Sequence, residues 1–294
     1  MTRDESLRVH GALLITAVLF SGNFIVSKMA MAVFAPMTFA WLRVFGAALL
    51  LNAITGRVRL ERDDRRRVTR FAILGVVINQ TLFLGGLSLT SAHVAAILIT
   101  TIPVFALGVA IVHRLERATA HKIGGIGLAC LGALLVIGGE QFEGSARSVV
   151  GAVMIVANCL AYATYLVLAR PLLQRIAPTV VIARMFAAGT VLMLPIAAWS
   201  LLREEWSAIP PSAWLSLLLV ILGPTVGAYL LNAWALRYAE SSLVAAYIYV
   251  QPVLTTILAA IYLGEQLHWL VAVAGGLIFI GVAIAGRAPG PIAE

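Results

Sequence analysis

The fold is decided by the stretch SSLVAAYIYVQPVLTTILAAIYLGEQLHWLVAVAGGLIFIGVAIA, Ser241 to Ala285, because a diverged second copy of it spans Ser91 to Val136. In both copies Val-Ala-Ala leads within a few residues to a proline inside an apolar run. A Glu then precedes two glycines by the same distances of 11 and 16 residues, Glu116 before Gly127 and Gly132, and Glu265 before Gly276 and Gly281. Matched spacing of this kind predicts an internal duplication.

The composition indicates a membrane protein with many spans. Of 294 residues 61% are hydrophobic and 12% are charged, and the mean hydropathy is +0.99, whereas soluble domains are about 25% charged. A helix of about 20 apolar residues crosses a bilayer. Ten such runs are present: Val9 to Met31, Ala35 to Ile54, Val68 to Ser88, His93 to Val112, His121 to Gly138, Ser148 to Ala169, Pro178 to Ser200, Ser212 to Ala235, Ser242 to Leu263 and His268 to Gly286.

The duplication extends, more weakly, over five spans in each half. Ala35-Pro36 recurs as Ala177-Pro178, and the segment that begins at Arg43 recurs at Arg184. Since five is odd, the second unit must enter the membrane from the opposite face, as in many secondary transporters. We therefore expect an all-α polytopic membrane protein of ten transmembrane helices in two inverted five-helix repeats. The repeats are residues 1–138 and 148–286, joined by an external connector, 139–147, and followed by a cytoplasmic tail, 287–294.

The net charge of +8 has its explanation in membrane topology rather than in nucleic-acid binding. With the N-terminus inside, the basic run Arg57 to Arg70 and most other loop cations face the cytoplasm, and only Arg147 and Arg203 face outside. We expect both termini in the cytoplasm, a lipid bilayer as partner and no nucleic acid. The first span is not read as a signal peptide, because it belongs to the repeat.

The sequence carries no enzyme motif and predicts no cofactor or metal. It lacks Gly-x-Ser-x-Gly, His-Glu-x-x-His and a phosphate-binding loop. The two cysteines, Cys130 and Cys159, lie inside spans, where no disulfide is expected. All 13 acidic residues lie in loops or at span ends, although a carboxylate at mid-membrane is the usual carrier of a proton or a cation. This disfavours proton-coupled export of hydrophobic cations and favours either diffusion down a gradient or coupling by a less obvious means.

Uncharged polar side chains at membrane depth mark a candidate substrate cavity. Burying such groups without partners is costly, so they should face a cavity or one another. Counting back six residues from Gly86 and from Ala235 makes Gln80 the repeat partner of Tyr229. For any one of these side chains, the alternative to contact with a substrate is a hydrogen bond between helices. The candidates are Asn23, Asn79, Gln80, Thr101, Asn158, Tyr162, Tyr229, Trp234, Tyr249 and Gln251, and Asn232 and Tyr247 are polar positions in the same spans.

Prolines and embedded charges add candidates for movement and for ionic contacts. Pro103 and Pro252 lie at matching depths, where broken helices point to a binding site or are static kinks. His93 is either a proton-sensitive gate or a solvated side chain. The embedded cations are Lys28, Arg43 and Arg184. Lys28 is expected to extend toward the interface. The two arginines are expected to pair with backbone carbonyls at helix ends, or one of them with a substrate carboxylate.

The patterns around Pro252, Gly264-Glu265, Gly275-Gly276 and Gly281, with Phe20-Ser21-Gly22-Asn23-Phe24 in the first span, resemble the EamA family of the drug/metabolite transporter superfamily. Within it the chain is most similar to YddG-type amino-acid exporters, and it departs from many members, which carry Trp, at Ser21. The resemblance implies ten helices in a basket, a central cavity lined by spans one to four and six to nine, spans five and ten at the periphery, and export of small metabolites.

We therefore expect a secondary transporter in a bacterial inner membrane that exports amino acids, aromatic and other neutral ones included, by alternating access. Amides and hydroxyls suit a zwitterion, and apolar walls suit its side chain. The alternatives are a drug or nucleotide-sugar carrier and, more remotely, a membrane enzyme acting on a lipid-linked substrate. Small residues in spans five and ten, such as Gly125, Ala129, Gly276 and Gly281, favour close helix packing, either within the chain or in a homodimer.

Overall fold

A computed structural model describes residues 3–56, 58–115, 119–143, 146–239, 244, 247–266 and 269–286. Every regular element in these ranges is helical. The elements are α1 (Arg3–Ala30), α2 (Pro36–Thr55), α3 (Arg62–Ala72), η1 (Ile73–Ile78), α4 (Asn79–Leu89), α5 (Ala92–Ile99), α6 (Ile102–Val112), α7 (Ala120–Glu143), α8 (Ala146–Arg175), α9 (Pro178–Arg203), η2 (Trp206–Ala208), α10 (Pro211–Val220), η3 (Ile221–Gly227), α11 (Ala228–Tyr238), η4 (Tyr247–Tyr249), α13 (Val250–Leu263) and α14 (Trp269–Gly286).

In the part of the chain that the structure describes, seven helical segments are long and apolar enough to cross a membrane. They are Leu7–Ala30, Pro36–Thr55, Arg62–Leu89, Ala92–Val112, Ala146–Arg175, Pro178–Arg203 and Pro211–Tyr238. Three shorter apolar helices, Ala120–Leu135, Tyr247–Leu263 and Ala272–Gly281, lie where the three remaining apolar runs were expected. The expectation of a polytopic helical membrane protein is thereby confirmed.

The boundaries differ from the expected ones at the middle of the chain. The expected connector 139–147 is mostly helical, because α7 continues to Glu143 and α8 begins at Ala146. Arg57, Glu116 and the expected tail 287–294 lie outside the described residues.

Two helices begin in the same way, at the prolines of the matched Ala-Pro pairs. Pro36 opens α2 and Pro178 opens α9, and the residue before each proline has an extended backbone with ψ of 137° at Ala35 and 127° at Ala177. Proline suits the first turn of a helix, since the amide hydrogen that it lacks has no partner there. Helices α2 and α9 then pack against each other along their length.

Several membrane segments are not regular α-helices. The segment Arg62–Leu89 contains the π-helical turn η1 between α3 and α4, and Pro211–Tyr238 contains η3 between α10 and α11, with Pro224 inside it. Such turns leave backbone carbonyls free and often lie at functional sites. The segment Ala92–Val112 is interrupted at Thr100 and Thr101, just before Pro103, and η4 precedes Pro252 in the same way.

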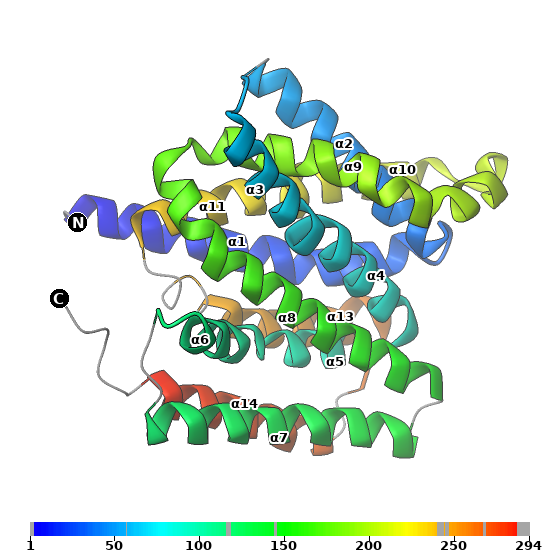
Figure 1. Ribbon diagram of the computed structural model, residues 1–294. Coiled ribbons are helices and arrows are strands. Elements are labelled where there is room, and N and C mark those ends of the chain that lie inside the picture. Colours follow the sequence, from blue (N-terminus) through cyan, green and yellow to red (C-terminus); the bar gives the residue numbers. More distant parts are fainter. Residues whose placement is uncertain are drawn as a thin grey trace.

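Helices α7 and α14 pair at one edge of the bundle, where Figure 1 shows them side by side. Small residues allow the close approach. A Cβ atom on Gly132 would lie 2.7 Å from the carbonyl oxygen of Ala274, and one on Gly281 would lie 2.6 Å from that of Gly125. The small-residue surface is therefore used for packing within the chain.

This packing predicts opposite effects for two substitutions in α14. Gly281→Ala places a methyl group against backbone that cannot yield, and we expect a loss of about 1–3 kcal/mol of stability. Gly276→Ala is the matched control, because no atom lies within 4 Å of its Cβ position and alanine favours a helix. The melting temperatures of the two purified variants in detergent, compared with that of the wild-type protein, measure both changes in stability. Equal melting temperatures would contradict the packing described here.

Candidate functional site

A cavity opens in the middle of the bundle, among helices from both halves of the chain. Its empty volume is about 720 Å³, which includes the space at its mouth. Among the described residues that line it, none is acidic and none comes from α7, α9 or α14. The lining consists of Leu13, Thr16, Ala17, Phe20, Asn23, Phe24, Arg43, Asn79, Gln80, Phe83, Ile99, Ile102, Asn158, Tyr162, Leu166, Tyr229, Asn232, Val244, Tyr247, Ile248 and Gln251.

The polar side of the cavity is a connected network around Asn79. The Asn79 side-chain amide donates to Asn158 Oδ1 on α8 over 2.7 Å. The Gln80 amide donates to Tyr229 Oη over 2.9 Å and to Asn79 Oδ1 over 3.2 Å. The Tyr229 hydroxyl lies 2.9 Å from Asn79 Oδ1 and 3.2 Å from the carbonyl oxygen of Gly75. Three helices, α4, α8 and α11, are thus joined through neutral groups.

The irregular helical turns place this network. Asn79 and Gln80 follow η1 directly, and Tyr229 is the second residue after η3. The carbonyl of Gly75 belongs to η1 and is reached by the Tyr229 hydroxyl. Gln80 and Tyr229, identified from the sequence as corresponding positions of the two halves, are in direct contact.

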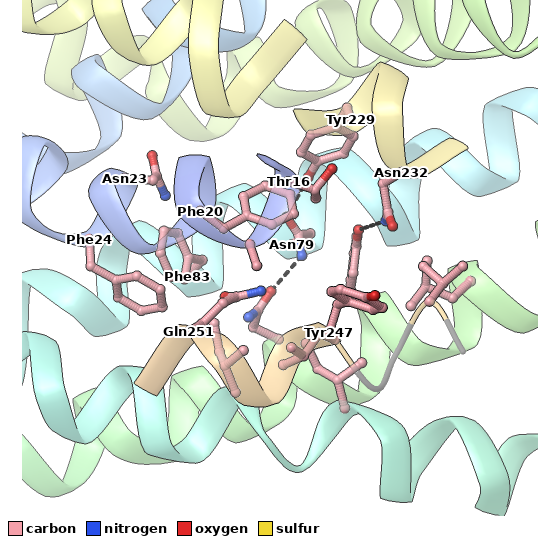
Figure 2. Close-up of a pocket in the computed structure, with 18 of the residues that line it drawn as sticks. Thr16, Phe20, Asn23, Phe24, Asn79, Phe83, Tyr229, Asn232, Tyr247 and Gln251 are labelled. Carbon is pink, nitrogen blue, oxygen red and sulfur yellow. Dashed lines mark hydrogen bonds between the residues drawn. The ribbon is translucent and has the colours of Figure 1, made fainter. Parts of the chain in front are cut away.

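A second polar contact joins α8 and α11 at the cavity. The Asn232 amide donates to Tyr162 Oη over 2.8 Å, and Figure 2 shows this bond on the cavity wall beside Tyr247. The Tyr247 hydroxyl in turn lies 2.5 Å from His10 Nδ1 on α1. Sequence reasoning marked Asn232 and Tyr247 only as polar positions and missed His10, which lies near the start of the first span.

Part of the lining is aromatic. The rings of Phe24 and Phe83 meet edge to face at 5.3 Å, and those of Phe20 and Tyr229 at 6.1 Å (Figure 2). Sequence reasoning missed these three phenylalanines, because a phenylalanine that faces a cavity and one that faces lipid look alike in an apolar run. Asn23 lies in the same part of the wall and accepts a hydrogen bond of 3.0 Å from Ser27.

Arg43 is the single cation among the lining residues and is 1% exposed. Its Nε and Nη2 donate to Thr225 Oγ1 in η3 over 3.1 and 2.8 Å. The backbone pairing that the sequence suggested for both arginines is found at Arg184 instead. Arg184 donates to Asn52 Oδ1 and to the carbonyl oxygens of Gly56 and Val58, at 2.7 and 3.0 Å, beyond the end of α2.

Three expected lining residues are placed elsewhere. The Thr101 hydroxyl bonds to the carbonyl oxygen of Leu98 at the break in its helix. The Trp234 ring packs on Tyr238, with centroids 5.0 Å apart, and the Tyr249 ring packs on Phe279 of α14, 5.2 Å away. The other seven, Asn23, Asn79, Gln80, Asn158, Tyr162, Tyr229 and Gln251, line the cavity.

A second cluster of charged groups ties α1 and α5 to the loop after α13. Glu265 accepts hydrogen bonds from the amides of Ala92 and His93, at 2.9 and 3.1 Å, and lies 2.8 Å from His93 Nδ1. The Lys28 ammonium donates to Glu265 over 3.2 Å and to the carbonyl oxygen of Thr90 over 2.6 Å. His93 is thus a buried hydrogen-bond partner of Glu265 rather than a solvated side chain.

The environment of Glu265 changes its acidity. Partial burial acts to raise the pKa of Glu265, but hydrogen bonds from His93 and the Ala92 amide, together with the Lys28 ammonium, lower it to about 2. The carboxylate at this loop is therefore strongly held in its charged form.

No ligand set for a metal ion is apparent in the described part of the chain. Groups of three or more His, Cys, Asp or Glu side chains placed to hold a metal ion are not found among these residues. The chemistry available at the cavity is thus that of hydrogen bonding, one cation and aromatic surface.

Two segments of the chain, residues 8–138 and 149–287, match the model of the EamA-like transporter family. Similar proteins are named as transporters. An uncharacterized transporter of Archaeoglobus fulgidus is 28% identical over 94% of this chain and 96% of its own length. The uncharacterized inner membrane transporter YedA of Escherichia coli K12 is 24% identical over 95% and 91%.

One similar protein has a named substrate class. A probable terminal-alkyne amino-acid exporter of Streptantibioticus cattleyicolor is 25% identical over 94% of this chain and 92% of its own length. A solved structure, described only as "Crystal structure of protein", superposes with a TM-score of 0.67 at 20% identity and covers 94% of this chain and 98% of the other. That likeness shows a shared fold.

The Glu265 cluster predicts a pH-dependent contribution to stability. Because the folded-state pKa of Glu265 is depressed below its ordinary 4.5, its contribution is present above about pH 4.5 and is lost as the pH falls toward 2. We expect Glu265→Gln to cost about 1–2 kcal/mol at pH 7. Melting curves of both proteins in detergent should converge between pH 4.5 and 2. A difference that persists unchanged at pH 2 would contradict this assignment.

Proposed function

Since the chain belongs to the EamA-like transporter family, we propose that it exports amino acids, aromatic and other neutral ones included, across a bacterial inner membrane by alternating access. The cavity is the substrate site in this proposal. In this proposal the transported solute binds to the polar network around Asn79 and against the phenylalanines Phe20, Phe24 and Phe83.

One observation carries the proposal, namely that the cavity combines neutral amides and hydroxyls with aromatic rings and a buried arginine, with no carboxylate among the described residues that line it. An α-amino acid has both an anionic and a cationic end and, in the neutral members, an apolar side chain. Amides can both donate and accept, so they suit the two charged ends, and aromatic surface suits the side chain. A hydrophobic cation would find no carboxylate here.

The comparisons support this substrate class. The Streptantibioticus cattleyicolor relative is named as an exporter of an amino acid, and the similarity extends over nearly the whole of both chains. The cavity that lies within the similar region has the polar groups that an amino acid requires.

The proposal includes ten membrane spans in two inverted repeats, residues 1–138 and 148–286. The family model matches twice, once in each half. The π-helical turns η1 and η3 lie in the third span of each half, and Gln80 meets Tyr229, its counterpart. Residues related by a twofold axis can contact each other only where they lie close to that axis, so this contact supports an axis that passes near Gln80 and Tyr229.

The proposed orientation has both termini in the cytoplasm. In Figure 1 the beginning of α1 and the end of α14 lie at the same end of the bundle, as an even number of spans requires. The absence of an acid from the lining favours movement of the substrate down its own gradient, without a carboxylate that carries a proton across.

Transport by purified protein tests the substrate class. Liposomes that contain the protein and are loaded with radiolabelled phenylalanine, leucine, methionine or threonine should release at least one of them faster than protein-free liposomes. Tyr229→Phe removes a hydroxyl from the network and should slow release by about tenfold, since one buried hydrogen bond is worth about 1 kcal/mol or more.

The control for this substitution is Tyr249→Phe. It removes a hydroxyl from a ring that packs on Phe279 and does not line the cavity, and release should be unchanged. If no amino acid is released faster, the substrate proposal is wrong. If both variants behave alike, the cavity is not the site.

The inverted arrangement is tested by labelling single cysteines in a background without Cys130 and Cys159. Cysteines at positions 147 and 203 should react with an impermeant reagent added outside intact cells, and one at position 65 should react only after the membrane is opened. Labelling of positions 65 and 147 from the same side would exclude the inversion.

A further inference from the structure

Two polar atoms at the cavity lack any hydrogen-bond partner. Arg43 Nη1 is a buried donor without an acceptor, and Gln80 Oε1 is a buried acceptor without a donor. Both residues line the cavity and are 1% and 2% exposed. Nearly all buried polar atoms in proteins are paired, so an unpaired donor and an unpaired acceptor beside one cavity require an explanation.

The Arg43 guanidinium is held in place, but its charge is not balanced. Two of its three nitrogens bond to Thr225 Oγ1, which orients the group and leaves Nη1 free. Thr225 is neutral, and no carboxylate contacts Arg43 in the described part of the chain. A buried charge without a counter-ion is unfavourable. An anionic group that enters the cavity would relieve this cost.

The Gln80 amide is held with its oxygen unpaired for a separate reason. Asn79 uses its own amide nitrogen to bond Asn158, so it presents its oxygen to Gln80. Only the nitrogen of Gln80 can donate to that oxygen, and the same nitrogen reaches Tyr229. The network therefore fixes the orientation of the amide and leaves Oε1 as an acceptor.

We infer that Arg43 binds the α-carboxylate of the transported amino acid and that Gln80 Oε1 accepts from its α-ammonium group. The inference rests on the proposed function and specifies the substrate as a zwitterion that must carry both groups. The free guanidinium nitrogen suits a carboxylate, since hydrogen bonds between two charged groups are short and strong. The neutral amide oxygen suits an ammonium without attracting a simple cation as strongly as a carboxylate would.

The same arrangement defines which solutes are rejected. An amine without a carboxylate leaves Arg43 unbalanced and brings a second positive charge into the cavity. A carboxylic acid without an ammonium leaves Gln80 Oε1 unpaired. A site built to bond two groups discriminates strongly against analogues that lack one of them, because its own buried groups then stay unpaired. Phe20, Phe24 and Phe83 provide the apolar surface for the side chain.

The competing role for Arg43 is structural. Its bonds to Thr225 join α2 to η3, and loss of that link alone could impair the protein. Thr225→Val separates the two roles, because it removes the link and keeps the guanidinium. Arg184→Gln is a second matched control, since Arg184 is another arginine at membrane depth whose partners are Asn52 and backbone carbonyls away from the cavity.

The experiment measures competition for a radiolabelled amino acid bound to the purified full-length protein in detergent, so that analogues cannot leak across a membrane. With phenylalanine as tracer, the competitors are phenylalanine, 2-phenylethylamine and 3-phenylpropionate. We expect each analogue to compete at least tenfold more weakly than phenylalanine with the wild-type protein. If the liposome experiment identifies a different amino acid, that amino acid is the tracer, and its competitors are the corresponding amine without the carboxylate and the corresponding acid without the ammonium group.

The variants assign the two ends of the substrate. Arg43→Gln should weaken the binding of phenylalanine at least tenfold, so that phenylalanine no longer competes better than 2-phenylethylamine. Gln80→Met should weaken the binding of phenylalanine and leave the binding of 3-phenylpropionate unchanged. Thr225→Val and Arg184→Gln should keep the wild-type order of competitors. Gel filtration and melting temperatures check that each variant folds. If Arg43→Gln does not fold, the inference is tested by two results, the binding of phenylalanine to Gln80→Met and the order in which the three competitors displace the tracer from the wild-type protein.

The outcomes separate this inference from the proposed function. If amino acids are released from liposomes but Arg43→Gln keeps the preference for phenylalanine over its amine, the inference is wrong and the function stands. The inference is also wrong if Thr225→Val and Arg43→Gln lose that preference equally. It is wrong as well if Gln80→Met binds phenylalanine as tightly as the wild-type protein does. Failure to release any amino acid overturns the function itself.

Discussion

A polar group inside the hydrocarbon of a bilayer has no water to bond, so it must find a partner in the protein or in a molecule that the protein binds. Most groups at membrane depth in this chain satisfy the requirement internally. Thr100 and Thr101 donate to the carbonyl oxygens of Ile97 and Leu98 where their helix is interrupted, and Arg184 bonds to carbonyl oxygens beyond the end of α2. Buried side-chain atoms of Thr81, Arg170, Tyr249 and Thr255 also lack a partner, but of the six described residues with such atoms only Arg43 and Gln80 line the cavity.

Helix irregularity and polarity occur together in the structure. The π-helical turns η1 and η3 come directly before Asn79 and Ala228, and the interrupted segment at Thr100 lies next to the lining residues Ile99 and Ile102. The pair α7 and α14 shows the opposite character, with glycines in close backbone contact and no lining residue.

Sequence reasoning succeeded where one physical property of each residue was sufficient. The apolar runs predicted the helices, because transfer into hydrocarbon depends on composition over about 20 residues. Polar side chains inside those runs pointed to Asn79, Gln80, Asn158 and Tyr229, since burial of such groups is costly anywhere in a membrane. The resemblance to the EamA family, seen in the patterns around Pro252 and Gly281, is confirmed by the family model.

What the sequence determined by itself is therefore a helical membrane protein of this family whose polar groups at membrane depth are uncharged or basic. Only the tertiary structure decided which face of each helix lines the cavity. Tyr249 turns to Phe279 and not to the cavity, whereas Phe20, Phe24 and Phe83 turn inward. It also decided that Arg43 lies in the cavity while Arg184, its counterpart, does not. The reason is that direction depends on how a helix is rotated against its neighbours, and hydropathy along a nearly uniform apolar span carries little information about rotation.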